Sequence, residues 1–245
     1  MRTVLLLALA AALGGVAVGV GAGAGAEERP RLRVLAAASL TEAFPRIDGR
    51  NRYGFGGSNQ LAFQIRQGAP ADVFASASPT YTQALFREGL VERPVRFASN
   101  SLVLIVPREN PAGVRSVFDL RRRGIRLVVG SPQVPIGSYT RTVLQRLGLA
   151  RAVLANVASQ EPDVKGIVTK VALGEADAGF VYGTDARAAG RRVVKIALPA
   201  RAQPVVRYEV AVVARSEHEA AARSWIRTLL GPRAQRVLRE AGFGA

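Results

Sequence analysis

Cysteine is absent from this chain of 245 residues, and histidine occurs only once. Without cysteine the protein can form no disulfide and no thiolate metal site, and a lipid has no cysteine to acylate as a membrane anchor. The one histidine, His218, lies in the polar run "RSEHEAAA" and is expected on the surface. A histidine-based metal cluster is therefore excluded, and a Ser-His-Asp triad is disfavoured. We expect a binding protein with no catalytic residues rather than an enzyme.

Acidic residues are scarce: 18 Asp and Glu stand against 34 Lys and Arg, which gives a formal net charge of +16. Such a charge is compatible with a nucleic acid or an anionic membrane as partner. The arginines are spread along the chain, however, and the clusters "RRRGIR" (121–126) and "GRR" (190–192) contain no interleaved aromatic residue. We expect a solvated basic surface that attracts an anionic ligand, and no nucleic-acid partner. An exported protein that binds polyanions through this surface is an alternative.

The first 26 residues have the layout of a secretory signal peptide. One arginine precedes a long apolar run, and small residues follow up to Ala24-Gly25-Ala26. A membrane-anchoring helix is the alternative, but it needs about 20 consecutive apolar residues, and the second half of this segment is rich in glycine. We expect cleavage before Glu27 and export to the periplasm. No later segment of the sequence is long and apolar enough to span a bilayer.

Beyond residue 27, apolar runs of strand length alternate with amphipathic segments of helical length. This alternation is typical of βαβ units and predicts an α/β fold with mostly parallel sheets. Two longer strands, "SLVLIVP" (101–107) and "VRYEVAVVAR" (206–215), flank the middle of the chain and predict two crossings between lobes. We therefore expect a discontinuous first lobe, residues 27–104 and 209–245, and a second lobe, residues 105–208, inserted into it.

Small or hydroxyl-bearing residues recur where a predicted strand passes into a predicted helix. Ser39 follows "LRVLAAA", Ser58 follows "YGFGG", Ser138 follows "QVPIG", and Asp163 precedes "VKGIVTKVALGE". Each can be an ordinary N-cap, whose side chain accepts a hydrogen bond from a helix N–H group. Helix N-termini also bind anions, and in an open α/β sheet these turns meet at the carboxyl ends of the strands. Four such turns in one chain indicate a shared anion site.

Four segments, in order along the chain, carry a resemblance to a known family. They are "AAASLTEAF", "GGSNQLAFQIRQGAPADVFASAS", "FASNSLVLIVP" and "VALGEADAGFVYGTDA". With them the chain resembles the molybdate-binding proteins of bacterial ABC importers over most of residues 31–245. The resemblance implies a type II periplasmic binding protein fold, in which two lobes joined by two crossing strands hold an oxyanion in the cleft. It also implies delivery of the anion to an ABC permease in the inner membrane, and we expect a monomer.

The resemblance further implies which residues bind the anion. Carried over position by position, they are Ser39, Ser58, Ile136, Val164 and Tyr182. The run "GGSNQ" permits an offset of one residue, which makes Asn59 the substitute for Ser58. Ile136 and Val164 would contribute backbone N–H groups and Tyr182 a hydroxyl, for which the motif "GFVYGTDA" is the support; core packing of a strand tyrosine is the alternative. One departure from the family is the short segment 45–52, where Pro45 is expected to truncate the first helix.

The chemistry of molybdate suits this set of donors. The ion is a tetrahedral dianion that only accepts hydrogen bonds, so hydroxyl and N–H groups can bind it without a paired cation. We expect molybdate, or the similar tungstate, as the ligand, no cofactor, and no direct coordination of a metal by side chains. Phosphate carries a proton near neutral pH and needs an acceptor, which these donors do not supply. The same fold binding another oxyanion, such as sulfate, is a further alternative.

Overall fold

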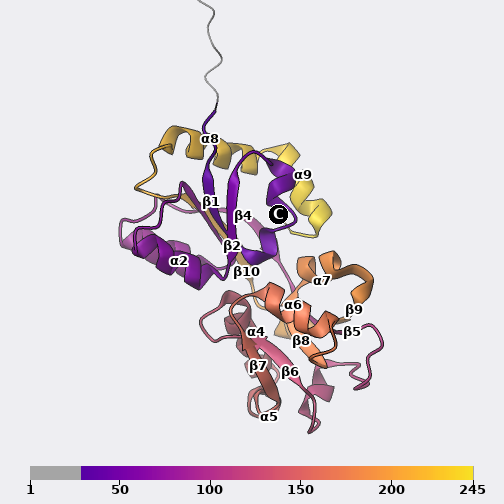
Figure 1. Cartoon of the computed structure of the whole chain (residues 1–245). Coiled ribbons are helices and arrows are strands. Elements are labelled where there is room, and N and C mark those ends of the chain that lie inside the picture. The colour runs from indigo at the N-terminus through magenta and orange to yellow at the C-terminus, as the bar shows by residue number, and fades with distance from the viewer. Residues whose placement is uncertain (1–28, 245) are drawn as a thin grey trace, which may run out of the picture.

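Two five-stranded sheets organise residues 29–244, the residues that the computed structural model describes (Figure 1). The first sheet has the strand order β2-β1-β3-β10-β4 and the second the order β7-β6-β8-β5-β9. The strands of the first sheet are β1 (Arg33–Ala37), β2 (Arg52–Gly56), β3 (Val73–Ser76), β4 (Val95–Asn100) and β10 (Val206–Val212). Those of the second are β5 (Leu102–Pro107), β6 (Leu127–Gly130), β7 (Val157–Glu161), β8 (Ala178–Tyr182) and β9 (Val193–Ala197). The expected signal peptide, residues 1–26, lies outside the described residues.

Each sheet has four strands in one direction and a fifth that opposes them. In the first sheet β1 pairs in parallel with β2 and β3, whereas β10 runs antiparallel to β3 and β4. In the second, β6 pairs in parallel with β7 and β8, whereas β5 runs antiparallel to β8 and β9. The opposing strand is in each case the one that arrives from the other lobe. The predicted α/β fold with mostly parallel sheets is confirmed.

The chain crosses between the lobes twice. Ser101 alone separates β4 from β5, so the chain passes directly from the first sheet into the second. It returns through the 3₁₀ turn η4 (Ala200–Ala202) into β10 of the first sheet. The lobe boundaries expected at 104/105 and 208/209 fall inside β5 and β10, whereas the change of sheet occurs before the start of each strand. These crossings bring the carboxyl ends of β1 and β8, far apart in sequence, to the space between the lobes.

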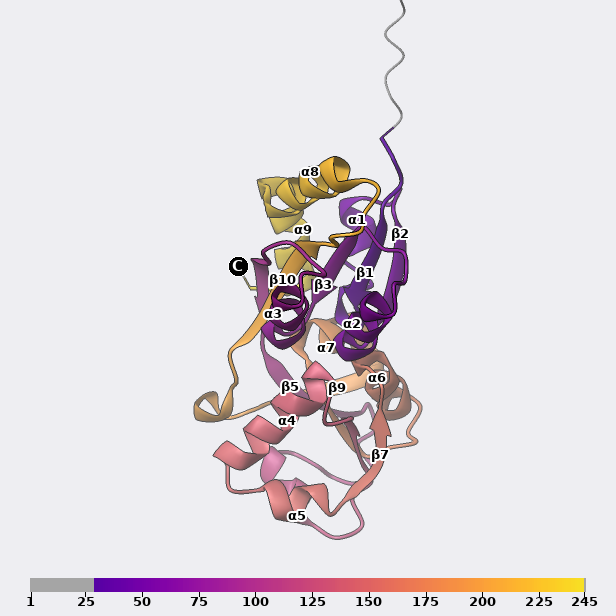
Figure 2. The same ribbon diagram turned by 90° about the vertical axis from the view of Figure 1, so that its left-hand side faces the viewer.

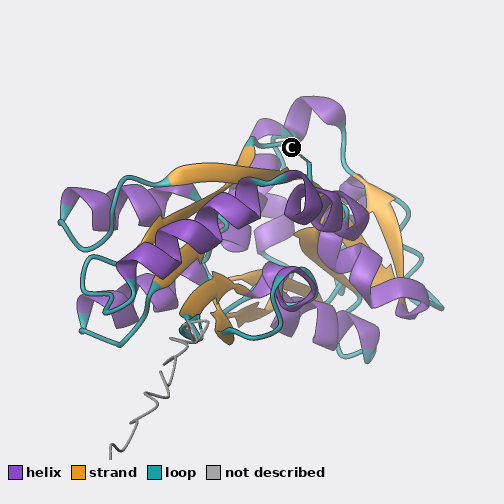
Figure 3. Ribbon diagram, turned by 90° about the horizontal axis from the view of Figure 1, so that it is seen from above, coloured by secondary structure: helices purple, strands orange, loops and turns teal. Residues whose placement is uncertain are grey.

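Helices cover both faces of the sheets (Figures 2 and 3). In the first lobe, Phe74 of β3 packs with Leu61 and Leu85, whereas its neighbour Val73 belongs to the core that contains Trp225. Successive strand residues point to opposite faces, so β3 is buried by a different helix on each side. The helices of this lobe are α1 (Phe44–Ile47), α2 (Ser58–Arg66), α3 (Pro79–Arg87), α8 (Glu219–Leu230) and α9 (Pro232–Ala241).

The second lobe is built in the same way, and its three central strands, β6, β8 and β5, are buried on both faces. Its helices are α4 (Pro135–Arg146), α5 (Ala150–Leu154), α6 (Val164–Ala172) and α7 (Gly183–Ala189). Two short 3₁₀ helices complete this lobe: η2 (Val117–Arg121) lies between β5 and β6, and η3 (Gly190–Arg192) follows α7. Within residues 29–244, no helix has the length and hydrophobicity needed to cross a membrane.

Two expected helix starts are wrong, and proline explains both. The helix expected to start at Ser39 is a 3₁₀ turn, η1 (Ala38–Leu40), followed by the four-residue α1. Pro45 has no N–H group, so it fits the first turn of α1 but cannot lie inside a longer helix. The helix expected to open at Ser138 begins instead at Pro135, because proline is favoured in the first turn of a helix, and Ser138 lies in that first turn.

Candidate functional site

A small cavity of about 10 Å³ lies between the two lobes. All five residues expected to bind the anion line it, and so do residues of both lobes on either side of them. Its walls are Ala37, Ala38, Ser39, Gly56, Gly57, Ser58 and Ala77 from the first lobe, and Val134, Pro135, Ile136, Asp163, Val164 and Tyr182 from the second. A space of this size holds about one water-sized sphere, which excludes a sugar or a nucleotide.

The two serines contribute buried hydroxyls from the first lobe. Ser39 lies in η1 and is 4% exposed, and its Oγ atom is 2.8 Å from the hydroxyl of Tyr208. Ser58 is the first residue of α2 and is 1% exposed, and its Oγ accepts a hydrogen bond from the N–H group of Ala77 at 3.1 Å. Neither side chain caps its own helix, so the interpretation of Ser39 and Ser58 as ordinary N-caps is wrong.

Helices α4 and α6 direct their N-termini toward the cavity from the second lobe. Asp163 caps α6 as predicted, because its Oδ1 accepts hydrogen bonds from the N–H groups of Lys165 (2.8 Å) and Gly166 (3.1 Å). Both of these bonds bypass the first residue of the helix, Val164, whose N–H group also has no acceptor within the helix. Ile136 is the second residue of α4, a helix without a side-chain cap. Its N–H group therefore also has no acceptor within its helix.

Tyr182 ends β8 and places its side chain at the cavity. The residue is 2% exposed, and its hydroxyl has no hydrogen-bond partner among the described residues. Burial raises the pKa of Tyr182 well above its ordinary value, so the hydroxyl keeps its proton and remains a donor. The ring also packs edge-on against Tyr139 and Tyr208, with centroid distances of 6.5 and 6.0 Å. Core packing by the ring is therefore compatible with a free hydroxyl, which a bound acceptor would satisfy.

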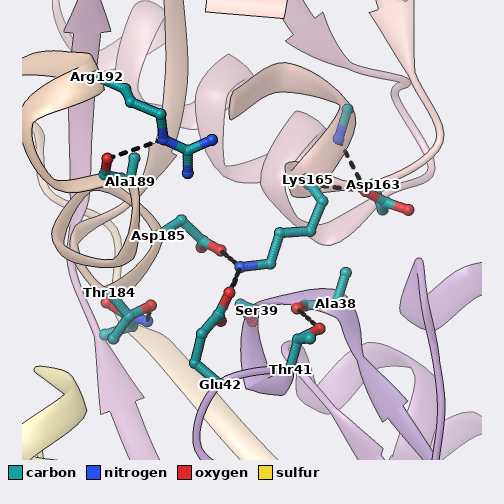
Figure 4. A network of polar contacts seen from close by, with 12 residues as sticks. Ala38, Ser39, Thr41, Glu42, Asp163, Lys165, Thr184, Asp185, Ala189 and Arg192 are labelled. Atoms are coloured by element: carbon teal, nitrogen blue, oxygen red, sulfur yellow. Dashed lines mark hydrogen bonds and ion pairs between the residues drawn. The ribbon is translucent and has the colours of Figure 1, made fainter. Parts of the chain in front are cut away.

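Beside the cavity, one lysine lies between carboxylates of both lobes (Figure 4). Lys165 Nζ is 2.7 Å from Glu42 Oε1 in the first lobe and 3.1 Å from Asp185 Oδ1 in the second. Burial raises the pKa of Asp185 to about 6, and the nearby Lys165 only partly opposes this rise. The pKa of Lys165 is raised in turn, because the two carboxylates outweigh the effect of its own burial.

The lobes approach closely around the cavity, so the structure represents a closed arrangement. A Cβ atom added to Gly57 would lie 2.4 Å from the carbonyl oxygen of Pro162 in the opposite lobe. The hydroxyl of Tyr81 in α3 also donates to the carbonyl oxygen of Gln133 in the second lobe. Glycine at position 57 is therefore required by space rather than by a special backbone angle, since its φ is −64°.

Three residues that the sequence analysis did not single out lie outside the cavity and contact residues around it. Tyr208 contacts Ser39, and Glu42 and Lys165 join the lobes, yet none of them lines the cavity wall. Two residues that the sequence did offer, Asn59 and Ser138, also lie away from the wall. The only signal for Tyr208 was its place in the long strand "VRYEVAVVAR", because contacts between distant segments leave no local pattern.

The chemistry of the wall is that of hydrogen-bond donors without cations. No Lys or Arg is among the described residues that line the cavity, and its one carboxylate, Asp163, is engaged in capping α6. Residues 29–244 also contain no cluster of three or more His, Asp or Glu side chains able to hold a metal ion. The site can therefore bind a fully deprotonated anion through hydroxyl and N–H groups.

Comparison with known proteins identifies the family of this chain. Residues 32–244 match the family described as bacterial extracellular solute-binding protein. The chain belongs to this family. Its members bind solutes, so the expectation of a binding protein in place of an enzyme is confirmed.

Curated relatives and a solved structure extend the match. The chain is 37% identical to "Molybdate-binding protein ModA" of Mycobacterium tuberculosis, over 86% of this chain and 83% of that protein. It is 33% identical to the protein of the same name from Escherichia coli, over 87% and 88% of the two chains. The periplasmic molybdate-binding protein of Azotobacter vinelandii superposes with a TM-score of 0.77 at 24% identity, over 88% and 99% of the chains, and this likeness shows the shared fold of a solute-binding protein.

Proposed function

We propose that this chain is the periplasmic substrate-binding component of a molybdate ABC importer. Five donors around one small interlobe cavity, with no cation among the described residues of its wall, carry this proposal. Ser39, Ser58 and Tyr182 supply hydroxyl groups, and Ile136 and Val164 supply backbone N–H groups. The names of the curated relatives, which are molybdate-binding proteins at 33–37% identity, support molybdate as the ion.

The energetics favour binding of a dianion by these groups. A hydrogen bond to a charged group contributes about 1.5–3 kcal/mol, so several such bonds offset much of the cost of removing the ion from water. Each helix N-terminus adds about 0.3–1 kcal/mol through its dipole. The donors come from both lobes, so binding requires and stabilises the closed arrangement.

We further propose the route of the protein and of its ligand. Residues 1–26 act as a signal peptide that is cleaved before Glu27, and the mature protein is a monomer that does not bind nucleic acid. It delivers the anion to an ABC permease in the inner membrane. Tungstate has the same charge and nearly the same size as molybdate, so the site binds it about equally well.

Calorimetry of residues 27–245 with a panel of oxyanions at constant ionic strength tests this function. We expect molybdate and tungstate to bind most tightly, sulfate less tightly because it is smaller, and phosphate weakly because its proton finds no acceptor. A protein that binds phosphate as tightly as molybdate would contradict the donor-only site. Equal, salt-sensitive binding of every anion would instead support polyanion binding through the basic surface.

Two serine variants test the site itself. Ser39→Ala and Ser58→Ala should each weaken molybdate binding about ten- to a hundredfold, since each removes a hydrogen bond to a charged ion. Ser138→Ala is the matched control, because Ser138 is an exposed serine in the first turn of α4 that does not line the cavity. If both cavity variants bind like the control, the ion lies elsewhere.

A further inference from the structure

A chain of hydrogen bonds leads from Asn100, at the end of β4, toward the cavity. The Oδ1 atom of Asn100 accepts the N–H group of Ser101 at 2.9 Å, which fixes the orientation of the amide. The Nδ2 atom therefore faces Thr184 Oγ1 at 2.9 Å and the Tyr208 hydroxyl at 3.4 Å. An amide nitrogen only donates hydrogen bonds, so the oxygen of Tyr208 is an acceptor in this contact.

Because Tyr208 accepts a hydrogen bond from Asn100, its own hydroxyl hydrogen is directed to Ser39. It is fully buried, and burial raises its pKa well above the ordinary value, so its hydroxyl carries one hydrogen. The two partners of this hydroxyl within residues 29–244 are Asn100 and Ser39. Because Asn100 can accept nothing through Nδ2, the Tyr208 hydrogen is satisfied only by donation to Ser39 Oγ at 2.8 Å. A serine whose oxygen is occupied in this way presents its own hydrogen elsewhere. Ser39 lines the interlobe cavity and a second hollow beside Glu42 and Thr184, and of these two the cavity is the space that it shares with the other four expected donors.

Ser58 is arranged in the same way by a different donor. Its Oγ accepts the backbone N–H of Ala77 at 3.1 Å, and a backbone N–H can never accept in return. The hydrogen of Ser58 is thus also left for the cavity. Each of the two serines therefore has a fixed donor behind it, although one donor is main chain and the other is the Tyr208 side chain.

We propose that Tyr208, oriented by Asn100, is a positioning residue that fixes Ser39 as a donor and so makes the site reject protonated tetrahedral anions. The inference rests on the function proposed above and adds the basis of its selectivity. A hydrogen phosphate ion must donate its proton, and the hydroxyl of Ser39 would have to turn to accept it. That turn breaks the hydrogen bond to Tyr208 or leaves the hydrogen of Ser39 without an acceptor. Molybdate and sulfate, which carry no proton at neutral pH, meet no such conflict.

Two variants change the direction of the relay in different ways. Tyr208→Phe removes the donor behind Ser39 and keeps the ring, which contacts Phe97 and Phe243 at centroid distances of 6.0 and 5.3 Å. Asn100→Asp replaces a donor by an acceptor, so Tyr208 would donate to the new carboxylate and accept from Ser39. Ser39 would then present a lone pair to the cavity. Tyr53→Phe is the control, because the hydroxyl of Tyr53 donates to the carbonyl oxygens of Asp48 and Phe44 and does not line the cavity.

The readout is the set of dissociation constants for molybdate, sulfate and phosphate at neutral pH and constant ionic strength. We expect Tyr208→Phe to weaken molybdate and sulfate about three- to tenfold each, as for loss of one hydrogen bond, and to leave phosphate unchanged or tighter. The added charge of Asn100→Asp should weaken all three dianions, but phosphate least. The ratio of phosphate to molybdate dissociation constants falls in both variants and stays constant in Tyr53→Phe.

The results separate this inference from the proposed function. If both relay variants weaken the three anions by one common factor, Tyr208 acts only through packing and the positioning role is wrong. If the unmodified protein does not prefer molybdate over phosphate, the proposed function is wrong and the inference falls with it. Thermal unfolding without ligand shows whether each variant is folded. If Asn100→Asp does not fold, Tyr208→Phe alone decides whether Tyr208 positions Ser39.

Discussion

Lys165 of α6 forms an ion pair with Glu42 of the opposite lobe, with 2.7 Å between Nζ and Oε1 (Figure 4). The same ammonium group lies 3.1 Å from Asp185, whose side chain is fully buried in the second lobe. Lys165 is the second residue of α6, the helix whose first N–H group faces the cavity. One lysine therefore connects the two lobes directly beside the site, and its contact with Glu42 joins residues of different lobes, so it exists only when the lobes are closed.

Glu42→Gln should weaken molybdate binding about two- to fivefold. The substitution removes the interlobe pair and so destabilises the closed arrangement, and a partly exposed pair contributes only about 0.2–1 kcal/mol. Calorimetry measures the change. Glu240→Gln is the control, because Glu240 pairs with Arg46 within the first lobe at 2.7 Å. Equal affinity of Glu42→Gln and the unmodified protein would show that the pair does not contribute to closure.

Gly57→Ala should weaken binding by about tenfold or more while leaving the free energy of unfolding nearly unchanged. Its Cβ atom would lie 2.4 Å from the Pro162 carbonyl oxygen, so the lobes could not close fully. Gly49→Ala is the control, since a Cβ atom there meets only the carbonyl oxygen of Pro45 in the same lobe, at 3.3 Å, and Gly49 does not line the cavity. Small-angle scattering with saturating molybdate should show a less compact particle for Gly57→Ala than for the control. A particle as compact as the control would mean that the lobes adjust around the methyl group.

Tyr182→Phe should weaken molybdate binding about ten- to a hundredfold and at the same time stabilise the ligand-free protein. The hydroxyl is buried without a partner among residues 29–244, and such a group costs about 1–3 kcal/mol until an acceptor binds. Calorimetry gives the affinity, and thermal unfolding without ligand gives the stability. A variant that loses stability without losing affinity would show that Tyr182 is a packing residue only.

Asp185 should make the stability of the protein depend on pH between about 4 and 6. Its pKa is raised from 3.8 to about 6 in the folded protein, so the folded state binds the proton more tightly than the unfolded state. This contribution is fully present below pH 4 and is lost as the pH rises through 6, by up to about 3 kcal/mol. Chemical denaturation should show that the unmodified protein loses stability relative to Asp185→Asn as the pH rises from about 4 to 6, because residue 185 of the variant does not titrate. A difference that is independent of pH would contradict the raised pKa.

The sequence by itself determined the elements that depend on neighbouring residues. Alternating apolar runs predicted the α/β class, because strand and helix periodicities are local properties of the chain. Asp163 was predicted as a cap from its position before "VKGIVTKVALGE", and it caps α6. The resemblance of four segments named Ser39, Ser58, Ile136, Val164 and Tyr182, which the structure brings to one cavity, although their binding of an anion remains a prediction.

Only the tertiary structure decided how these residues are held. Ser39 was expected to cap a helix, but it lies in a 3₁₀ turn and contacts Tyr208, 169 residues away. Lys165 and Glu42, 123 residues apart, meet only because the chain crosses twice between the lobes. A side chain's hydrogen-bond partner depends on which distant segment packs beside it, and sequence periodicity reports only the face on which the side chain lies. The wall of the site could therefore be predicted from the sequence, whereas the supports behind that wall are set by long-range packing.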